Sequence, residues 1–71
     1  MLFSFVYPDK TQSLVEVSHI TYDFEENYLA LHAFHTIRFR CYVRRYNEIC
    51  NEIYNTGRSD IRDLEYLYDK E

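Results

Sequence analysis

Residues 32–46, HAFHTIRFRCYVRRY, decide how the middle of this chain folds. Apolar and aromatic residues in and around this stretch recur at helical spacing, and residues 23–55 contain no glycine or proline. Because those two residues are the commonest helix breakers, the pattern favours one long helix. On such a helix a single broad stripe would hold Phe24, Tyr28, Leu31, His32, His35, Phe39, Tyr42, Val43, Tyr46, Ile49, Cys50 and Ile53.

The flanking residues carry signals for the two ends of this helix. Asp23 followed three residues later by Glu26 resembles a capping box, and acidic side chains suit the positive end of the helix dipole. Gly57 stands where a left-handed C-terminal cap belongs. The sequence therefore predicts a helix over roughly 24–56, with a break or kink allowed near residue 36.

A second interpretation of the same stretch is a β-strand. Ile37, Phe39, Cys41 and Val43 alternate with more polar positions, as the residues of a half-buried strand do. The alternative fold is thus an antiparallel β-meander to about residue 43, followed by two helices. Residues 46–56 are helical under both interpretations.

The two ends of the chain complete the expected fold. Residues 2–7 and 14–22 are rich in β-branched and aromatic residues and flank the turn at Pro8, which predicts a β-hairpin. Ser59 is placed to cap a last helix over 60–70. The preferred prediction is an α+β fold in one domain, 1–71, with the hairpin packed on the long helix and the short C-terminal helix.

The long helix would also carry a second apolar stripe, formed by Ala30, Phe34, Ile37 and Cys41. A helix that is apolar on two sides must be covered on two sides. A chain of 71 residues buries only about 60% of its unfolded surface, so a partner would add needed area. Both arguments predict a homodimer.

Composition limits the classes of function. The net charge is −4, with 12 acidic against 8 basic residues, and this gives no general attraction to nucleic acid or anionic membranes. No apolar run approaches the length of a membrane span, which is about 20 residues. The sequence has two cysteines and lacks the features of a secretory signal, so we expect a reduced, cytoplasmic protein without a membrane partner.

Support for catalysis or cofactor binding is weak. The chain has one glycine, so a glycine-rich phosphate loop is not available, and no nucleophile motif is present. His32 and His35 have a spacing that suits two metal ligands on a helix, but no matching second pair of ligands follows. We therefore expect a non-enzymatic protein with no catalytic residues, no cofactor and no metal.

Two groups of residues remain as candidates for binding a partner. The first is the arginine cluster at 38–45, and the second is an acidic surface with a tyrosine near the C-terminus. The sequence predicts an inhibitor or adaptor that binds stoichiometrically to a protein. In type it is similar to small inhibitor proteins of phages and mobile elements, with no shared motif. The acidic and tyrosine surfaces would occupy a basic groove that normally holds nucleic acid. The alternative is a small nucleic-acid-binding regulator that uses the arginines. The candidate residues are Arg38, Arg40, Arg44, Arg45, Asp60, Asp63, Tyr66 and Asp69.

Overall fold

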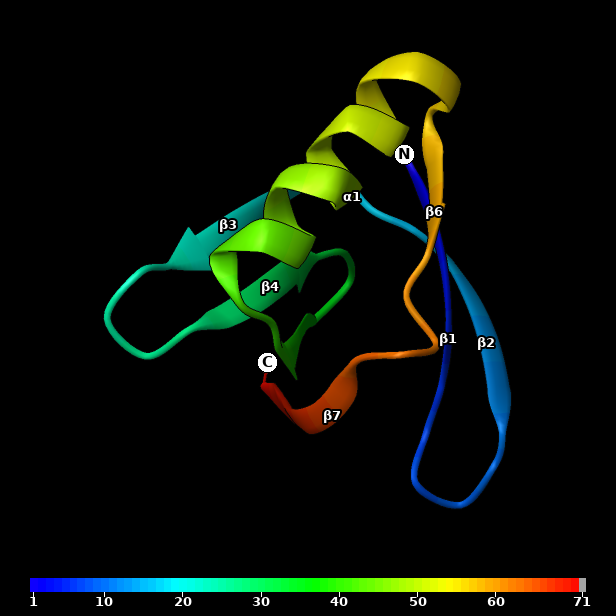
Figure 1. Cartoon of the computed structure of the whole chain (residues 1–71). Helices are drawn as coiled ribbons and strands as arrows, with labels where there is room; N and C mark the ends of the chain where they lie inside the picture. Colours follow the sequence, from blue (N-terminus) through cyan, green and yellow to red (C-terminus); the bar gives the residue numbers. More distant parts are fainter. Residues whose placement is uncertain (71) are drawn as a thin grey trace.

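The computed structural model describes residues 1–70, which form two small β-sheets and one helix (Figure 1). Strands dominate the described part of the chain, and the helix is 14 residues long. The elements in chain order are β1 (Leu2–Val6), β2 (Gln12–Glu16), β3 (His19–Asp23), β4 (Tyr28–His32), β5 (Thr36–Arg40), α1 (Val43–Thr56), β6 (Arg58–Asp60) and β7 (Glu65–Lys70).

The first sheet has the strand order β2-β1-β6. The N-terminal hairpin pairs β1 with β2 in antiparallel register, and its turn uses Lys10 in a left-handed conformation. Strand β6 joins the other side of β1 in parallel, immediately after α1 ends. The amide of Leu2 donates to the carbonyl of Gly57, so the start of the chain is tied to the end of the helix.

The second sheet has the strand order β3-β4-β5-β7, with every neighbour antiparallel. Two tight connections link β3, β4 and β5 into a meander. Strand β7 then pairs with β5, with an irregularity beside Arg38 and Phe39 that leaves Leu67 without a direct partner in the register. Such a bulge bends a strand locally.

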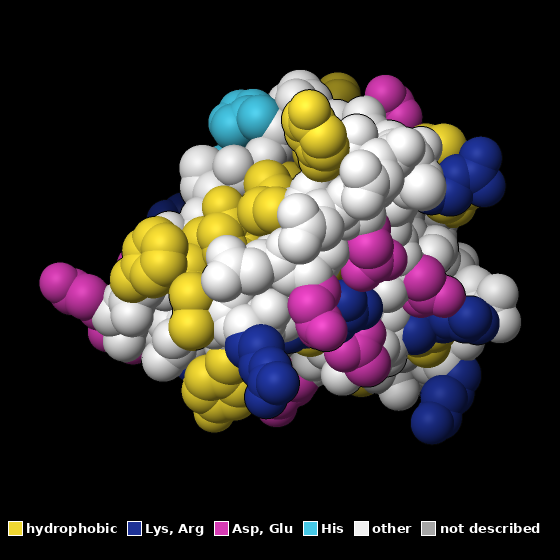
Figure 2. All heavy atoms as spheres, turned by 45° about the horizontal axis from the view of Figure 1, so that its top comes forward, with side chains coloured by type: hydrophobic (Ala, Val, Ile, Leu, Met, Phe, Trp, Pro, Cys, Tyr) yellow, Lys and Arg dark blue, Asp and Glu magenta, His cyan; other side chains and the backbone are white. Residues whose placement is uncertain are grey.

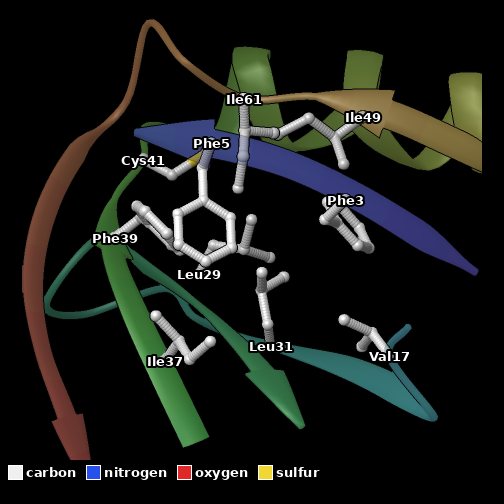
Figure 3. Packing of buried hydrophobic residues seen from close by; sticks show 10 residues of the cluster. All are labelled: Phe3, Phe5, Val17, Leu29, Leu31, Ile37, Phe39, Cys41, Ile49 and Ile61. Atoms are coloured by element: carbon white, nitrogen blue, oxygen red, sulfur yellow. The ribbon is translucent and has the colours of Figure 1, made fainter. Parts of the chain in front are cut away.

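The two sheets face each other across one hydrophobic core (Figure 3). In each strand every second side chain points inward, and on β4 and β5 these are aliphatic or aromatic. The Phe5 and Phe39 rings meet edge-to-face across the two sheets, with their centroids 5.0 Å apart. The buried cluster consists of Phe3, Phe5, Val17, Leu29, Leu31, Ile37, Phe39, Cys41, Ile49 and Ile61.

Helix α1 closes one side of the space between the sheets. It lies beside β6 and directs Ile49, which is completely buried, into the core. One turn earlier, Tyr46 stacks on Tyr22 of β3 with ring centroids 4.4 Å apart. The helix thus touches both sheets and covers core that a pair of small sheets leaves open.

The predicted helix over 24–42 is wrong. The alternation of Ile37 and Phe39 with polar residues directs one face of β5 into the core, and β4 does the same. The hydrogen bonds expected of the capping box do form, but in a turn and not at a helix start. Asp23 Oδ1 accepts hydrogen bonds from the backbone amides of Glu25 and Glu26 in the turn between β3 and β4. An aspartate that accepts nearby amides stabilises turns as well as helix starts.

The other predicted boundaries also need correction. The strand expected over 14–22 is two strands, because the chain passes from one sheet to the other at Val17 and Ser18. The helix expected over 60–70 is wrong, since this segment forms a turn and then β7. Ser59, the expected cap, is instead buried within β6. The α+β description is accordingly replaced by a mostly β fold.

The alternative interpretation agrees with the strands up to residue 40, but its second helix is wrong in the same way. The end of α1 is confirmed: Gly57 adopts φ 75° and its amide bonds to the carbonyl of Ile53. The two-sided helix that suggested a homodimer does not exist, since Ala30, Ile37 and Cys41 are core residues. The homodimer stays a prediction without that argument.

We expect Ile49→Ala to lower the free energy of unfolding by about 2–5 kcal/mol, because it removes buried methyl groups and leaves a cavity. Tyr54→Ala is the matched control on the same helix, where the side chain is 89% exposed, and it should change stability by less than about 0.5 kcal/mol. Urea unfolding followed by circular dichroism measures both. Equal losses would contradict the placement of Ile49 at the centre of the fold.

Candidate protein-binding surface

The four candidate arginines are on three different surfaces. Arg38 and Arg40 lie on the face of β5 that points away from the core. Arg44 is exposed in the first turn of α1, while Arg45, the next residue, points toward the loop after β6. The sequence placed them in one cluster, but the change from strand to helix at residues 41–43 separates them.

Arg45 is committed to bonds within the protein. Its guanidinium makes a two-pronged contact with Asp63, with N–O distances of 3.0 Å, and a further contact of 2.9 Å with Glu52. It also donates to the backbone carbonyl of Asp60. The hydrogen bonds from Arg45 lower the pKa of the Asp63 carboxyl. Arg45 therefore joins α1 to the segment between β6 and β7.

The candidate acidic surface is likewise divided. Asp60 and Asp63 lie beside α1, where Asp60 also pairs with Arg62 at 2.7 Å. Tyr66 and Asp69 lie on β7. The predicted helix would have joined these four residues, but the extended backbone of β7 separates the two pairs.

Tyr66 and Asp69 belong to a cluster that closes the second side of the core. The Tyr66 ring packs edge-to-face on Tyr7, with centroids 5.1 Å apart, and burial raises the pKa of Tyr66 to about 12. Asp69 lies 2.8 Å from His35 Nε2 and accepts a long hydrogen bond from the Tyr7 hydroxyl. These contacts hold β7 against β1 and the β4–β5 turn.

A group of exposed rings occupies the opposite side, where β3 meets α1. Tyr22 stacks on Tyr46, and Phe24 meets the Tyr22 ring edge-to-face at 4.8 Å. Phe24 is 68% exposed although it touches this cluster. We call these rings, together with the apolar side chains at the start and along one flank of α1, the aromatic band; it consists of Tyr22, Phe24, Tyr42, Val43, Tyr46, Cys50 and Tyr54.

The aromatic band continues along α1 because Tyr46, Cys50 and Tyr54 are spaced four residues apart and so share one flank of the helix. A hydrogen bond with Cys50 raises the pKa of the Tyr46 hydroxyl. Figure 2 shows hydrophobic side chains in a band on one side of the helix and acidic side chains gathered on its other side. Exposed apolar surface of this kind, bordered by charge, is typical of protein-binding sites.

A third surface is the outer face, which we define as the side of β3, β4, β5 and β7 that points away from the core. His19 and His32 stack there with their rings parallel and 4.3 Å apart. Burial, followed by the charges of His19 and Arg38, lowers the pKa of His32. Arg38 lies over two tyrosine rings, 5.0 Å from the centroid of Tyr68 and 5.9 Å from that of Tyr28.

The structure separates the two histidines that were considered as metal ligands. His32 pairs with His19, while His35 contacts Asp69. Within residues 1–70, no three His, Cys, Asp or Glu side chains are grouped to hold a metal ion. In the same part of the chain, no helix is long and apolar enough to cross a membrane.

Comparison with protein-family models, with curated proteins and with solved structures gives no match to this chain. The functional argument therefore depends on the geometry of the three surfaces.

Sequence reasoning missed most of the aromatic band. It assigned Phe24, Tyr46 and Cys50 to the buried stripe of a long helix, and it left Tyr54 unassigned. The signal that identifies the band is the pairing of aromatic residues at the end of one hairpin strand, Tyr22 and Phe24, with those at a helix start. This pairing has meaning only once β3 is recognised as a strand.

We expect Arg45→Gln to lower the free energy of unfolding at pH 7 by about 1 kcal/mol, since its partners are partly exposed to solvent. The pKa of Asp63 is lowered in the folded protein, so this contribution is present above about pH 4 and is lost as the pH falls through the lowered value. The difference between the variant and the wild type should shrink there. Arg44→Gln removes the same charge from an exposed site and is the control. Urea unfolding of both variants and the wild type at pH 7 and below about pH 4 measures the difference.

The lowered pKa of His32 predicts a second pH effect. The unfolded chain binds a proton at His32 more readily than the folded chain does, so stability should fall as the pH drops below the ordinary value of 6.5. His32→Asn should remove part of this loss, which thermal unfolding between pH 7.5 and pH 5 measures. An unchanged pH dependence would show that the stacked pair tolerates protonation.

Proposed function

We propose that this chain is a non-enzymatic binding protein that acts stoichiometrically on a protein partner, as an inhibitor or adaptor. The single observation that carries the proposal is the aromatic band. It exposes Phe24 and Tyr42 by about two thirds of their surface and Tyr54 almost fully. Tyrosine and other large rings supply much of the binding energy at protein interfaces, especially when charged groups surround them.

The band is also preorganised. Tyr22 donates a 2.6 Å hydrogen bond to the carbonyl of Cys41 while its ring stacks on Tyr46. These contacts fix two of the rings before a partner arrives, so less side-chain freedom is lost on binding. Phe24 rests against the same rings, and its exposed surface is free to enter a pocket.

The charges near the band favour a partner with a basic surface. Glu25 and Glu26 are exposed in the turn beside Phe24, and Glu48 is exposed on α1. Arg45 pairs with Glu52 on α1 and with Asp63 in the connection between β6 and β7, but the chain as a whole keeps a net charge of −4. Complementary charge would speed association and exclude acidic competitors. A basic groove that normally holds nucleic acid is a target of this kind.

The separation of the four arginines favours a protein target over the nucleic-acid regulator with a continuous arginine grip. Arg45 cannot reach a phosphate without leaving Asp63, and Arg44 lies on a different surface from Arg38. We further propose that the protein acts inside the cell. Cys41 is buried, and its burial raises the pKa of the thiol to about 11, which suits a structural, reduced cysteine.

The test is a double variant in the aromatic band, Phe24→Ser with Val43→Ser, used as bait in quantitative co-purification from cell extract. We expect the proteins retained by the wild type to fall at least about 10-fold, because truncation of interface anchors commonly costs more than 1–2 kcal/mol. Identification and titration of the purified partner then gives the Kd for both forms.

Leu14→Ser is the matched control. Leu14 is also an exposed apolar side chain, 69% accessible, but it lies on β2 and outside the band. It should retain the same partner as the wild type. Equal losses in the control and the band variant, or full retention by the band variant, would refute this assignment of the binding surface.

A further inference from the structure

The outer face differs from the rest of the surface in charge. It carries Arg38, Arg40 and Lys70, and among residues 1–70 only two acidic residues lie on it, Asp23 and Glu65. The whole chain, in contrast, has more acidic than basic residues. Asp23 keeps its negative charge but lies at the end of β3, where its Oδ1 accepts two backbone amides of the β3–β4 turn.

The same face is rich in rings. Tyr68 is 49% exposed and lies opposite Arg38 in the register of β5 and β7, and Tyr28 lies on β4 on the other side of this arginine. The stacked rings of His19 and His32 lie beside Thr36, two residues before Arg38 on β5. Phe34, in the turn between β4 and β5, is completely exposed.

Arg38 lies at the centre of this face, and no carboxylate of the described residues pairs with it. Within residues 1–70 its Nη1 atom is shielded from solvent and has no hydrogen-bond partner. The tyrosine rings below and beside it attract the cation, but they leave this donor without an acceptor. An unpaired buried donor costs free energy, so a small movement of the Arg38 side chain that brings this donor to an acceptor oxygen would be favourable.

We propose that the outer face binds single-stranded nucleic acid, with the exposed ring of Tyr68 and the half-buried ring of Tyr28 stacking on bases and with Arg38 and Lys70 contacting phosphates. Several proteins use a four-stranded sheet in this way and stack two or three bases on its aromatic residues. The aromatic rings on the outer face favour nucleic-acid bases over an acidic peptide as the ligand. Every base has a flat face that can stack on a ring, whereas a carboxylate would interact only with the positively charged side chains. This site is distinct from the aromatic band and does not depend on the proposed protein partner.

The net negative charge of the chain does not oppose such a site strongly. At physiological salt, charges separated by more than about 8 Å are largely screened. The molecule measures 28 × 27 × 22 Å, so much of the acidic surface lies beyond that distance from the outer face. Local charge then decides the interaction. We expect moderate affinity that falls with salt concentration.

The experiment is fluorescence anisotropy of labelled eight-nucleotide dT and rU strands, titrated with the full chain in 50 mM salt. Tyr68→Leu should weaken the Kd by about 5-fold or more, through loss of stacking. Lys70→Gln, an exposed change with little risk to folding, should weaken binding and reduce the salt slope by about one. Arg44→Gln and Arg58→Gln each remove one positive charge from another surface and serve as controls. Each should leave the Kd within about 2-fold of the wild-type value, because exposed substitutions away from a site change free energies by about 0.5 kcal/mol or less.

Absence of an anisotropy change at 50 mM salt would overturn the proposal. So would equal weakening by the controls, which would indicate binding through unspecific charge. Equal competition by polyglutamate at matched charge would instead indicate an acidic peptide site. The Phe24→Ser and Val43→Ser variant should bind the strands normally, so failure here is distinguishable from failure of the proposed protein-binding function.

Discussion

Burial of one small core between two sheets is the constraint on which the rest of the structure depends. Leu29, Leu31, Ile37 and Phe39 on β4 and β5 pack against Phe3 and Phe5 on β1, and each of these side chains is 0–1% exposed. Because side chains alternate along a strand, directing them inward commits their neighbours to the outer face. The two small sheets cannot enclose this core alone, so α1 closes one side and the Tyr7–Tyr66 contact closes the other.

This closure also decides which charged side chains remain available to a partner. Arg45 and Asp63 are taken up in joining α1 to the loop after β6, and Asp69 is taken up in holding β7 against Tyr7 and His35. Their role in the fold explains why half-exposed charges at these positions are poor indicators of a binding site. Arg38, by contrast, has no carboxylate partner within residues 1–70 and contacts two tyrosine rings of its own sheet instead.

Much of the local structure was predictable from the sequence, but the choice between helix and strand was not. The hairpin at 2–16 and the helix end at Gly57 follow from local signals, namely turn residues and a left-handed cap. Asp23 misled because an aspartate that accepts amides two and three residues ahead starts a helix or a hairpin turn equally well. The helix predicted over residues 60–70 was wrong because Ile61 and Leu64 have helical spacing, although they contact the core from a turn. Tertiary pairing with β5, which no local pattern reveals, made residues 65–70 a strand.

The same error affected the site prediction in a specific way. A helix through residues 38–45 keeps four arginines on the flanks of one rod, whereas a strand followed by a helix sends them to separate surfaces. The fold thereby gives a small acidic protein two unlike ring-bearing surfaces: the aromatic band near exposed carboxylates, and the outer face with Arg38 and Lys70. The two surfaces adjoin at the end of β3, where Asp23 of the outer face lies between Tyr22 and Phe24 of the aromatic band. An adaptor would use both surfaces, with ligands that do not both cover this end of β3, whereas a simple inhibitor needs only the aromatic band.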